Sequence, residues 1–288
     1  MISPQPKIIF WGSDEFSITV LEELLTNNLK PTLIITTPDS PQGRKLTLTP
    51  SPVKIWAEKN SVTYIAPDRL KHLTTEETNI LTLNYDIALV ASYGKIIPEA
   101  LLNIPRLKTL NIHPSLLPQY RGPTPIQTTI LNGDQETGVT LMLVDNLMDH
   151  GPIIAQVNLE LHQNETNQSL RHSLAILGAR LFITNLPTIL NQEITPQTQV
   201  EDHATYTKKI TKNDGEIDLE KDQPKKLAQK WRALNPWPGL FFFYTKNGTK
   251  QRIKISEASF TDDKFNIIKI IPEGKKETTW SNFQSSKN

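Results

Sequence analysis

The sequence predicts an α/β fold in which a Rossmann-like, mostly parallel sheet has helices on both faces, followed by a smaller module. Short apolar runs alternate with segments of helical periodicity over the first 190 residues. Several of these runs are apolar at every position, which is typical of strands buried on both faces. From residue 223 onward a single helical segment is followed by β-like segments alone.

The alternation begins at residues 7–12, an apolar run that ends in Gly12 and precedes a helical pattern from Phe16 to Leu25. Ligands of parallel sheets bind at the carboxyl ends of the strands, so we expect functional side chains at the ends of these runs. Further strands are predicted at 32–37, 62–66, 86–94, 109–113, 137–144 and 152–161, and helices at 52–60, 70–83 and 168–190, the last as one helix or two.

Residues 191–213 are polar with few apolar anchors, which predicts a linker between a domain at 1–190 and a module at 214–288. In this module we expect a helix at 223–234, a rigid turn at 235–239 and strands within 240–245, 252–258 and 265–271. The order of these elements predicts a small β-barrel-like (OB-like) module.

The charge of the chain is balanced overall but not along its length. Lys and Arg number 31 against 30 Asp and Glu, which argues against a protein that coats nucleic acid or membrane with one sign of charge. Residues 204–288, however, hold 17 basic and 10 acidic residues, a surplus of +7, while the first 203 residues carry −6. A basic module predicts a polyanionic partner, although a solvated charged surface would have the same composition.

The chain contains no cysteine, which excludes disulfides and cysteine metal sites, and its six His show no ligand-like spacing, so we expect no metal. No uninterrupted apolar run reaches the roughly 18 residues of a membrane span, and the N-terminus has no basic-then-apolar leader. These observations predict a cytoplasmic protein with no membrane contact.

Two polar side chains stand where the apolar strand at 109–113 is about to end. Asn111 and His113 are two residues apart, so on a strand they project from the same face. Asn can donate to a developing oxyanion, and His can give or take a proton near neutral pH. Taken alone, the pair could equally cap the strand and satisfy local backbone groups.

A second polar cluster follows the predicted strand at 137–144. The stretch "VDNLMDHG" at 144–151 contains Asp145 and Asp149, which by themselves could be turn formers. Beside a His and an Asn on a neighbouring strand end, one Asp could orient the imidazole and help relay protons.

The stretches "HPSLLPQYRG", "NGDQETGVTLM" and "MDHG" resemble the formyltransferases that use 10-formyltetrahydrofolate. The segments "IIFWGSDEFSITVLEELL", "PSPVK" and "RALNPWPG" are similar to the members of that family that act on methionyl-tRNA. The resemblance runs from Lys7 to Phe283 and preserves the order and spacing of the motifs. It implies formyl transfer from 10-formyltetrahydrofolate to the α-amino group of methionyl initiator tRNA, in translation initiation, by a monomer without a metal.

The resemblance also implies roles for single residues. Asn111, His113 and Asp149 match the catalytic residues: the first two stabilise the tetrahedral oxyanion, and Asp149 pairs with His113 and helps to move the proton. The residues matched to folate binding are Gly94, Lys95, Ile96, Ile97, Ser115, Leu116, Leu117, Pro118 and Asp145.

On the tRNA side, the Pro-rich stretch 36–54 is too long for a routine turn, and such loops are usually functional or disordered. It resembles the family's insertion that reaches the acceptor end of the tRNA, with Arg44 as the matching arginine and Lys45 beside it. Lys208, Lys209 and Arg232 belong to the basic surplus of the C-terminal part, which fits a module that holds the tRNA backbone. A mobile surface loop and a solvated surface remain the alternatives.

The sequence departs from the family pattern at several places; among them, Pro123 and Thr124 stand where small alanines are usual, and fewer basic residues follow Arg44. The C-terminal module is shortened, because only a few residues separate segments between which the family has further strands. Leu147 stands where the family prefers Gly, and His150 where it prefers Thr, so the loop that carries Asp149 could be reshaped.

Other functions remain open beside the leading one. A related enzyme could formylate a sugar amine or glycinamide ribonucleotide, or hydrolyse formyl-folate. A tRNA- or folate-binding protein that has lost turnover is a further alternative, against which stands the retention of Asn111, His113 and Asp149.

Overall fold

The structure is a computed structural model that describes residues 5–43, 46–246 and 249–285. These residues form two compact units, which are described separately below. The first comprises the residues up to 123 together with 137–159 and 171–206, and the second comprises 124–136, 160–170 and the residues from 207 onward.

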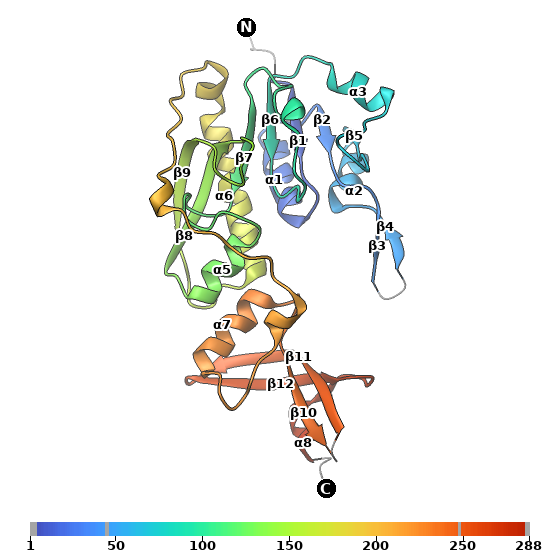
Figure 1. Cartoon of the computed structure of the whole chain (residues 1–288), viewed down its shortest axis with the longest axis vertical. Coiled ribbons are helices and arrows are strands. Elements are labelled where there is room, and N and C mark those ends of the chain that lie inside the picture. Colours follow the sequence, from blue (N-terminus) through green and yellow to red (C-terminus); the bar gives the residue numbers. More distant parts are fainter. Residues whose placement is uncertain (1–4, 44–45, 247–248, 286–288) are drawn as a thin grey trace. The chain divides into compact units, whose positions relative to one another are not determined.

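A seven-stranded sheet forms the centre of the first unit, within the described residues (Figure 1). Its strand order is β5-β2-β1-β6-β7-β8-β9. The four pairings from β5 to β7 are parallel and β7 pairs with β8 in the antiparallel sense, which confirms the mostly parallel sheet. The strands are β1 (Ile8–Trp11), β2 (Leu33–Ile35), β5 (Thr63–Ile65), β6 (Ile87–Val90), β7 (Thr109–His113), β8 (Glu136–Leu143) and β9 (Ile153–Glu160).

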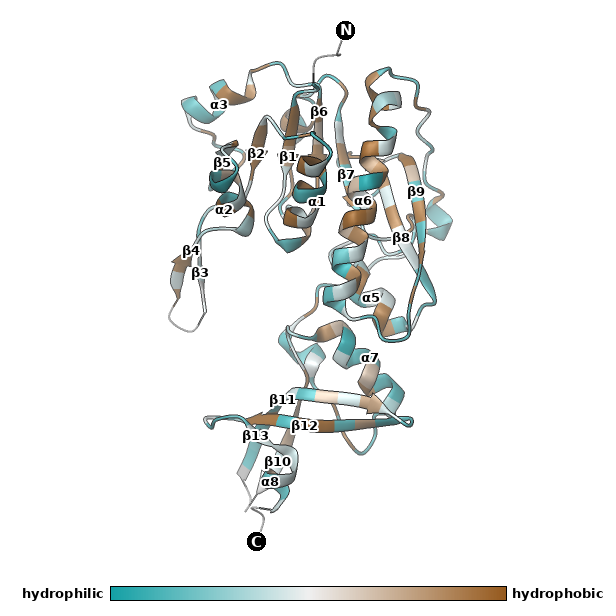
Figure 2. Cartoon of the chain, turned by 180° about the vertical axis from the view of Figure 1, so that it is seen from behind, coloured by the Kyte–Doolittle hydropathy of each residue, from teal (hydrophilic) through white to brown (hydrophobic). Residues whose placement is uncertain are grey.

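Helices cover both faces of the sheet, as the fully apolar strands predict. Figures 1 and 2 show α1 (Glu15–Thr26) and α6 (Asn167–Leu190) on one face, and Figure 2 shows that β1, β2 and β6 are predominantly hydrophobic. On the opposite face, side chains of α3 (Thr75–Leu81) and α4 (Glu99–Leu102) pack against alternate residues of β1 and β6. Helix α2 (Pro52–Lys59) contacts α1 and β5.

The sheet reverses its order between β1 and β6, because the chain winds from β1 to β2 and β5 on one side and from β6 to β7 on the other. Such a reversal separates the loops that follow the two central strands and is where doubly wound sheets bind their ligands. The carboxyl ends of β6 and β7 lie side by side, since Val90 pairs with Asn111. The loops after these two strands therefore share one edge of the sheet.

Three local features differ from the sequence predictions. The helix expected at 70–83 begins only at Thr75, because Thr74 caps it and exchanges hydrogen bonds with Glu77. The stretch 36–54 contains a two-stranded hairpin, β3 (Ser40–Gln42) and β4 (Thr47–Thr49), that was not predicted. The helix α5 (Pro125–Asn132) was also not predicted, although Pro125 at its first turn and Gly133 in the left-handed region after it are standard boundaries.

The second unit combines helices with a four-stranded antiparallel sheet of order β10-β11-β12-β13. Its strands are β10 (Phe241–Lys246), β11 (Thr249–Thr261), β12 (Lys264–Pro272) and β13 (Thr278–Thr279), and α8 (Trp280–Ser285) follows them. Helix α7 (Pro224–Leu234) buries Leu227 and Leu234 and contacts α5, β11 and β12. Among the described residues no pairing joins β10 to β13, so the shortened module is an open sheet and does not close into a complete barrel.

Helix α6 is long and apolar enough to cross a membrane by length and composition, which the sequence reading did not anticipate. The core helix of a soluble protein passes the same test. In the first unit, Leu174, Phe182 and Leu186 of α6 are buried. The position of Gly178 is equally tight, because a Cβ there would lie 2.3 Å from the Ile112 side chain in β7. These contacts identify α6 as a helix packed on the sheet.

Candidate active site

The last residues of β7 place two polar side chains on one face of the strand. Ile112 points to the face covered by α6, as its close approach to Gly178 shows, so Asn111 and His113 face the other way. The Asn111 amide makes no hydrogen bond within the described part of the chain. It therefore stands as an available donor at the carboxyl edge of the sheet.

His113 is 4% exposed and lies between two oxygen acceptors. Its Nε2 is 3.0 Å from the carbonyl of Tyr120, which can only accept, so this nitrogen carries the proton in that contact. Its Nδ1 is 3.5 Å from Oδ1 of Asp149. Both nitrogens thus face acceptors, an arrangement that the imidazolium with its two N–H groups satisfies fully. The longer contact leaves Nδ1 available to a substrate oxygen.

Asp149 reaches His113 from the loop between β8 and β9. Its Oδ2 accepts a 2.8 Å hydrogen bond from the backbone N–H of Gly122. Its φ of +50° lies in the left-handed region, which Asp tolerates better than most residues. The structure thus brings together the three residues that the sequence singled out for catalysis.

The loop of Asp149 also depends on Gly151, at which a Cβ would lie 1.9 Å from the Leu143 carbonyl. Leu147, in contrast, has a negative φ and is 63% exposed, so no glycine is required at that position. Leu147 therefore fits this loop without backbone strain. The positive φ of this loop falls on Asp149 itself.

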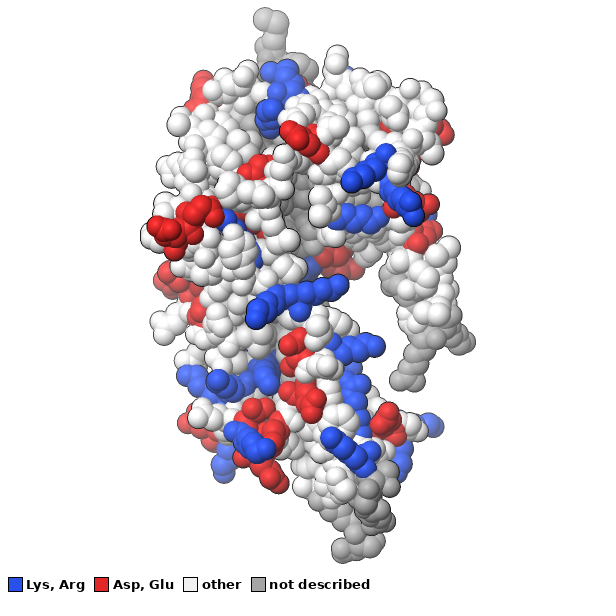
Figure 3. Space-filling model, viewed as in Figure 1, with Lys and Arg blue, Asp and Glu red and all other residues white. Residues whose placement is uncertain are grey.

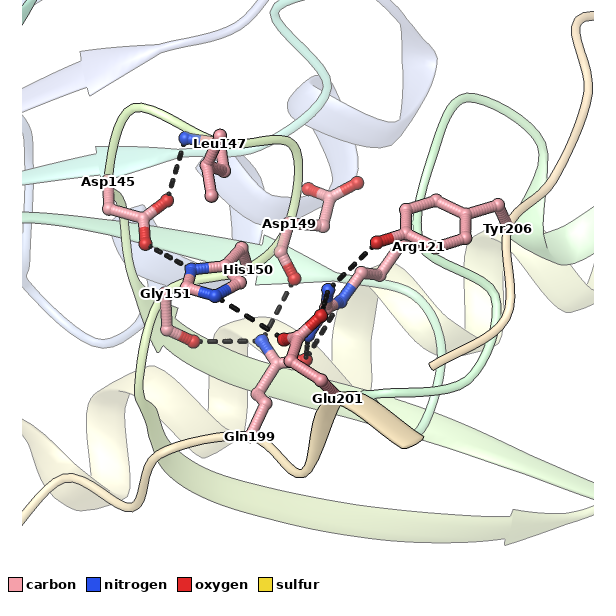
Figure 4. A network of polar contacts seen from close by, with 9 residues as sticks. All are labelled: Arg121, Asp145, Leu147, Asp149, His150, Gly151, Gln199, Glu201 and Tyr206. Carbon is pink, nitrogen blue, oxygen red and sulfur yellow. Dashed lines mark hydrogen bonds and ion pairs between the residues drawn. The ribbon is translucent and has the colours of Figure 1, made fainter. Parts of the chain in front are cut away.

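A polar network that the sequence reading missed lies beneath this loop (Figure 4). At its centre the guanidinium of Arg121, 1% exposed, donates to Oε1 of Gln199 over 3.1 and 2.9 Å and to Glu201 over 2.7 and 3.0 Å. Arg121 also donates to the hydroxyl of Tyr206 over 3.0 Å. The hydrogen bond from Arg121 lowers the pKa of the Glu201 carboxyl below its ordinary value, and the same contact raises the pKa of Arg121.

His150 connects this network to the first carboxylate of the loop. Its Nδ1 is 2.6 Å from Oδ2 of Asp145 and its Nε2 is 3.3 Å from Oε1 of Glu201. The other oxygen of Asp145 accepts the backbone N–H of Leu147 over 2.9 Å. Both carboxylate oxygens of Asp145 are therefore used by hydrogen bonds within its own loop.

The residues matched to folate binding occupy the loops at the same edge of the sheet. Asn146 donates to Glu99 over 3.2 Å, which ties the loop of Asp145 to the segment after β6. In that segment Ile96 is 93% exposed, whereas Ile97 packs against the core. Ser115 and Leu117 are buried. The Ser115 hydroxyl donates to the Gln119 carbonyl and the backbone N–H of Leu117 donates to the Thr140 hydroxyl, so both residues fix the loop. The matched residues in these loops are Gly94, Lys95, Ile96, Ile97, Ser115, Leu116, Leu117, Pro118 and Asp145.

The residues assigned to tRNA binding lie outside the loops that surround Asn111 and His113. Arg44 and Lys45 lie outside the described residues. Lys208 and Lys209 are exposed in the second unit, whereas Arg232 donates to the backbone carbonyls of Gln163 and Glu165. Burial lowers the pKa of Arg232. On the face drawn in Figure 3, basic side chains of this unit are interspersed with acidic ones.

Within the described residues, no group of three or more His, Cys, Asp or Glu side chains is arranged to hold a metal ion. The candidate site consists of the Asn111 amide, which can donate a hydrogen bond, and the His113–Asp149 pair, which can exchange a proton. Such a set suits acyl transfer, because the developing oxyanion and the moving proton each have a partner.

Comparison with known proteins agrees with this class of chemistry. A family model described as formyl transferase matches residues 6–186, and one described as formyl transferase, C-terminal domain, matches residues 209–272. The chain therefore belongs to the formyl transferase family.

Among its curated relatives are methionyl-tRNA formyltransferases. The protein from Sulfurihydrogenibium sp. is 36% identical over 273 residues, which cover 94% of this chain and 86% of the relative. The protein from Chloroflexus aurantiacus is 41% identical over 239 residues, 83% of this chain and 76% of the relative.

Solved structures share the fold. The methionyl-tRNA formyltransferase from Clostridium thermocellum has a TM-score of 0.61 at 20% identity and covers 93% of this chain and 98% of its own. An N-formyltransferase from Helicobacter canadensis, solved with folinic acid and dTDP-3-aminofucose, has a TM-score of 0.62 at 24% identity and covers 91% of this chain and 95% of its own. Membership of the formyl transferase family confirms the class of enzyme predicted from the sequence.

Proposed function

We propose that this chain transfers the formyl group of 10-formyltetrahydrofolate to the α-amino group of methionine on the initiator tRNA. The observation that carries the proposal is the convergence of His113 and Asp149, 3.5 Å apart, on the strand end that also presents Asn111. The methionyl-tRNA formyltransferases that match this chain over most of its length support the choice of acceptor.

The proposed chemistry needs one new bond and one broken bond. The neutral α-amine attacks the formyl carbon, and the carbonyl oxygen becomes an oxyanion that accepts hydrogen bonds from the Asn111 amide and from Nδ1 of His113. The carboxylate of Asp149 accepts a proton from the attacking nitrogen and delivers it to N10 as the bond from carbon to N10 breaks. Overall, one hydrogen of the amine replaces the formyl group on the folate.

The donor would occupy the loops after β6 and β7. In this proposal the backbone of residues 94–97 and 115–118 meets the pterin, because the side chains of Ser115 and Leu117 are buried in the loop. Asp145 would contribute through the position of its loop, since both of its oxygens are hydrogen-bonded there.

On the acceptor side, Arg44 and Lys45 would contact the acceptor end of the tRNA, and Lys208 and Lys209 its backbone. Because Arg232 donates to two backbone carbonyls, we propose it in a supporting role for that surface. The reaction belongs to translation initiation, so the cytoplasm is its expected compartment, and we propose that the protein acts as a monomer.

The choice of acceptor is tested by a panel of substrates. The purified chain is incubated with 10-formyltetrahydrofolate and, in parallel, with methionyl initiator tRNA, methionyl elongator tRNA or a dTDP-linked amino sugar. We expect rapid formylation of the initiator alone. Formylation of the sugar in preference to both tRNAs would contradict the proposed acceptor but would still be formyl transfer, as the family membership requires.

A further inference from the structure

Gln199 lies in a segment that the sequence presents as a linker, yet it is 6% exposed and uses both ends of its side chain. Its Nε2 donates to the carbonyl of Asp149 over 2.9 Å and to the carbonyl of Gly151 over 2.8 Å. Its Oε1 accepts both hydrogen bonds from the buried Arg121. The guanidinium has donors only, so it fixes which end of the amide faces the loop.

The two carbonyls that Gln199 binds lie on either side of His150. Pinning both on one amide group favours a tight turn, and in this turn Asp149 has its left-handed backbone. Figure 4 shows the Asp149 carbonyl directed toward Gln199 and its carboxylate directed away from it. The carboxylate is then held by the N–H of Gly122, the residue that follows Arg121.

A second arm from Arg121 holds the rest of the loop. Glu201 accepts from Arg121 and faces Nε2 of His150, whose Nδ1 faces Asp145. The buried guanidinium of Arg121 is thus connected to Asp149 through Gln199 and to Asp145 through Glu201 and His150.

We propose that Gln199, oriented by Arg121, is a positioning residue that sets the backbone of Asp149 and so directs its carboxylate to His113. An effect of Gln199 on turnover depends on the function proposed above. The hydrogen bonds from Gln199 to the Asp149 and Gly151 carbonyls, in contrast, can be tested without measuring activity.

The test uses Gln199→Glu. A glutamate still accepts from Arg121 but, ionised beside that guanidinium, it cannot donate to the two carbonyls. Gln197→Glu is the matched control, because it makes the same chemical change at an exposed position two residues away. We expect Gln199→Glu to lower kcat roughly 10- to 100-fold with little change in either KM, and the control to behave as wild type.

The same change is then made in an Asp149→Asn background. If Gln199 acts through the Asp149 carboxylate, its substitution there has no further effect on the residual rate. An equal loss of kcat in both backgrounds, or wild-type kcat for Gln199→Glu, would overturn the proposal.

Amide hydrogen exchange separates this proposal from the proposed function. Gln199→Glu should speed exchange within residues 145–151 and leave β7 protected, whereas Gln197→Glu should change neither. If the wild-type protein shows no formyl transfer, the proposed function is contradicted. Hydrogen exchange in residues 145–151 then still decides whether Gln199 positions Asp149. Unchanged exchange in Gln199→Glu would refute that role whatever the enzyme assay gives.

Discussion

At Asp149 the backbone and the side chain have different partners. The carbonyl is bound by Gln199, while the carboxylate faces His113 and Gly122. The residue must therefore combine a carboxylate with tolerance of a left-handed backbone, which few residues offer. Both demands meet in aspartate.

Replacing Asp149 with Asn keeps the acceptor for the Gly122 N–H and a residue that tolerates positive φ, but removes the charge and the proton acceptor. We expect kcat for formyl transfer to fall by about 10² to 10⁴ while the melting temperature stays close to wild type. Single-turnover formylation and thermal unfolding measure the two quantities. Near-wild-type turnover in a folded Asp149→Asn protein would sink the assigned role.

The ion pair between Arg121 and Glu201 predicts a pH dependence of stability. The pKa of Glu201 is lowered in the folded state, so its contribution is present above the unfolded pKa and is lost as pH falls through the folded value. The difference in free energy of unfolding between wild type and Glu201→Gln should therefore be constant near neutral pH and shrink below about pH 4.5. Urea unfolding at a series of pH values checks this, and a difference independent of pH would contradict it.

At the scale of elements, the order of apolar and polar residues along the sequence predicts where most strands and helices lie. The apolar runs predict the seven sheet strands, and the TLNIH stretch matches β7 residue for residue. Strands β1, β2 and β6 are continuous apolar runs because they are buried on both faces. Helix α5 escaped prediction because its short, Thr-containing sequence has a weak helical pattern, although Pro125 and Gly133 mark its ends.

The packing of α6 on β7 yields a prediction at this scale. Ala is a better helix former than Gly, yet a Cβ at Gly178 would lie 2.3 Å from the Ile112 side chain and 3.1 Å from that of Val139. We expect Gly178→Ala to destabilise the protein by about 1–3 kcal/mol through overpacking. Ser173→Ala on the same helix is the control and should be neutral. Chemical unfolding of both variants measures the difference, and a stabilised Gly178→Ala would show that the helix can move away from β7.

For the whole molecule, the three candidate catalytic residues could be located from the sequence, whereas the residues that support them could not. Asn111, His113 and Asp149 stand in recognisable motifs at strand ends. Arg121 and Gln199, in contrast, are 78 residues apart in the chain, so no local pattern links them. The two family models match 6–186 and 209–272, and the segment between them holds Gln199 and Glu201. The division into domains at 1–190 and 214–288 stays a prediction.

The basic surplus of the C-terminal part predicts salt-dependent tRNA binding. If Lys208 and Lys209 contact phosphates, each change to Gln should reduce the slope of log K against log salt by about 1. Lys59→Gln, at the end of α2 in the first unit, is the control and should leave the slope unchanged. Filter binding across a salt series measures it, and identical slopes for all variants would mean that these lysines lie outside the interface.

The central claim is that the formyl group moves from the folate to the methionyl nitrogen. The most direct measurement supplies 10-formyltetrahydrofolate labelled with ¹³C in the formyl group together with methionyl initiator tRNA, and follows the label by mass spectrometry after the aminoacyl ester is cleaved. We expect labelled formylmethionine in an amount equal to the tetrahydrofolate released. Label recovered as free formate, with methionine unmodified, would contradict it and would identify a hydrolase.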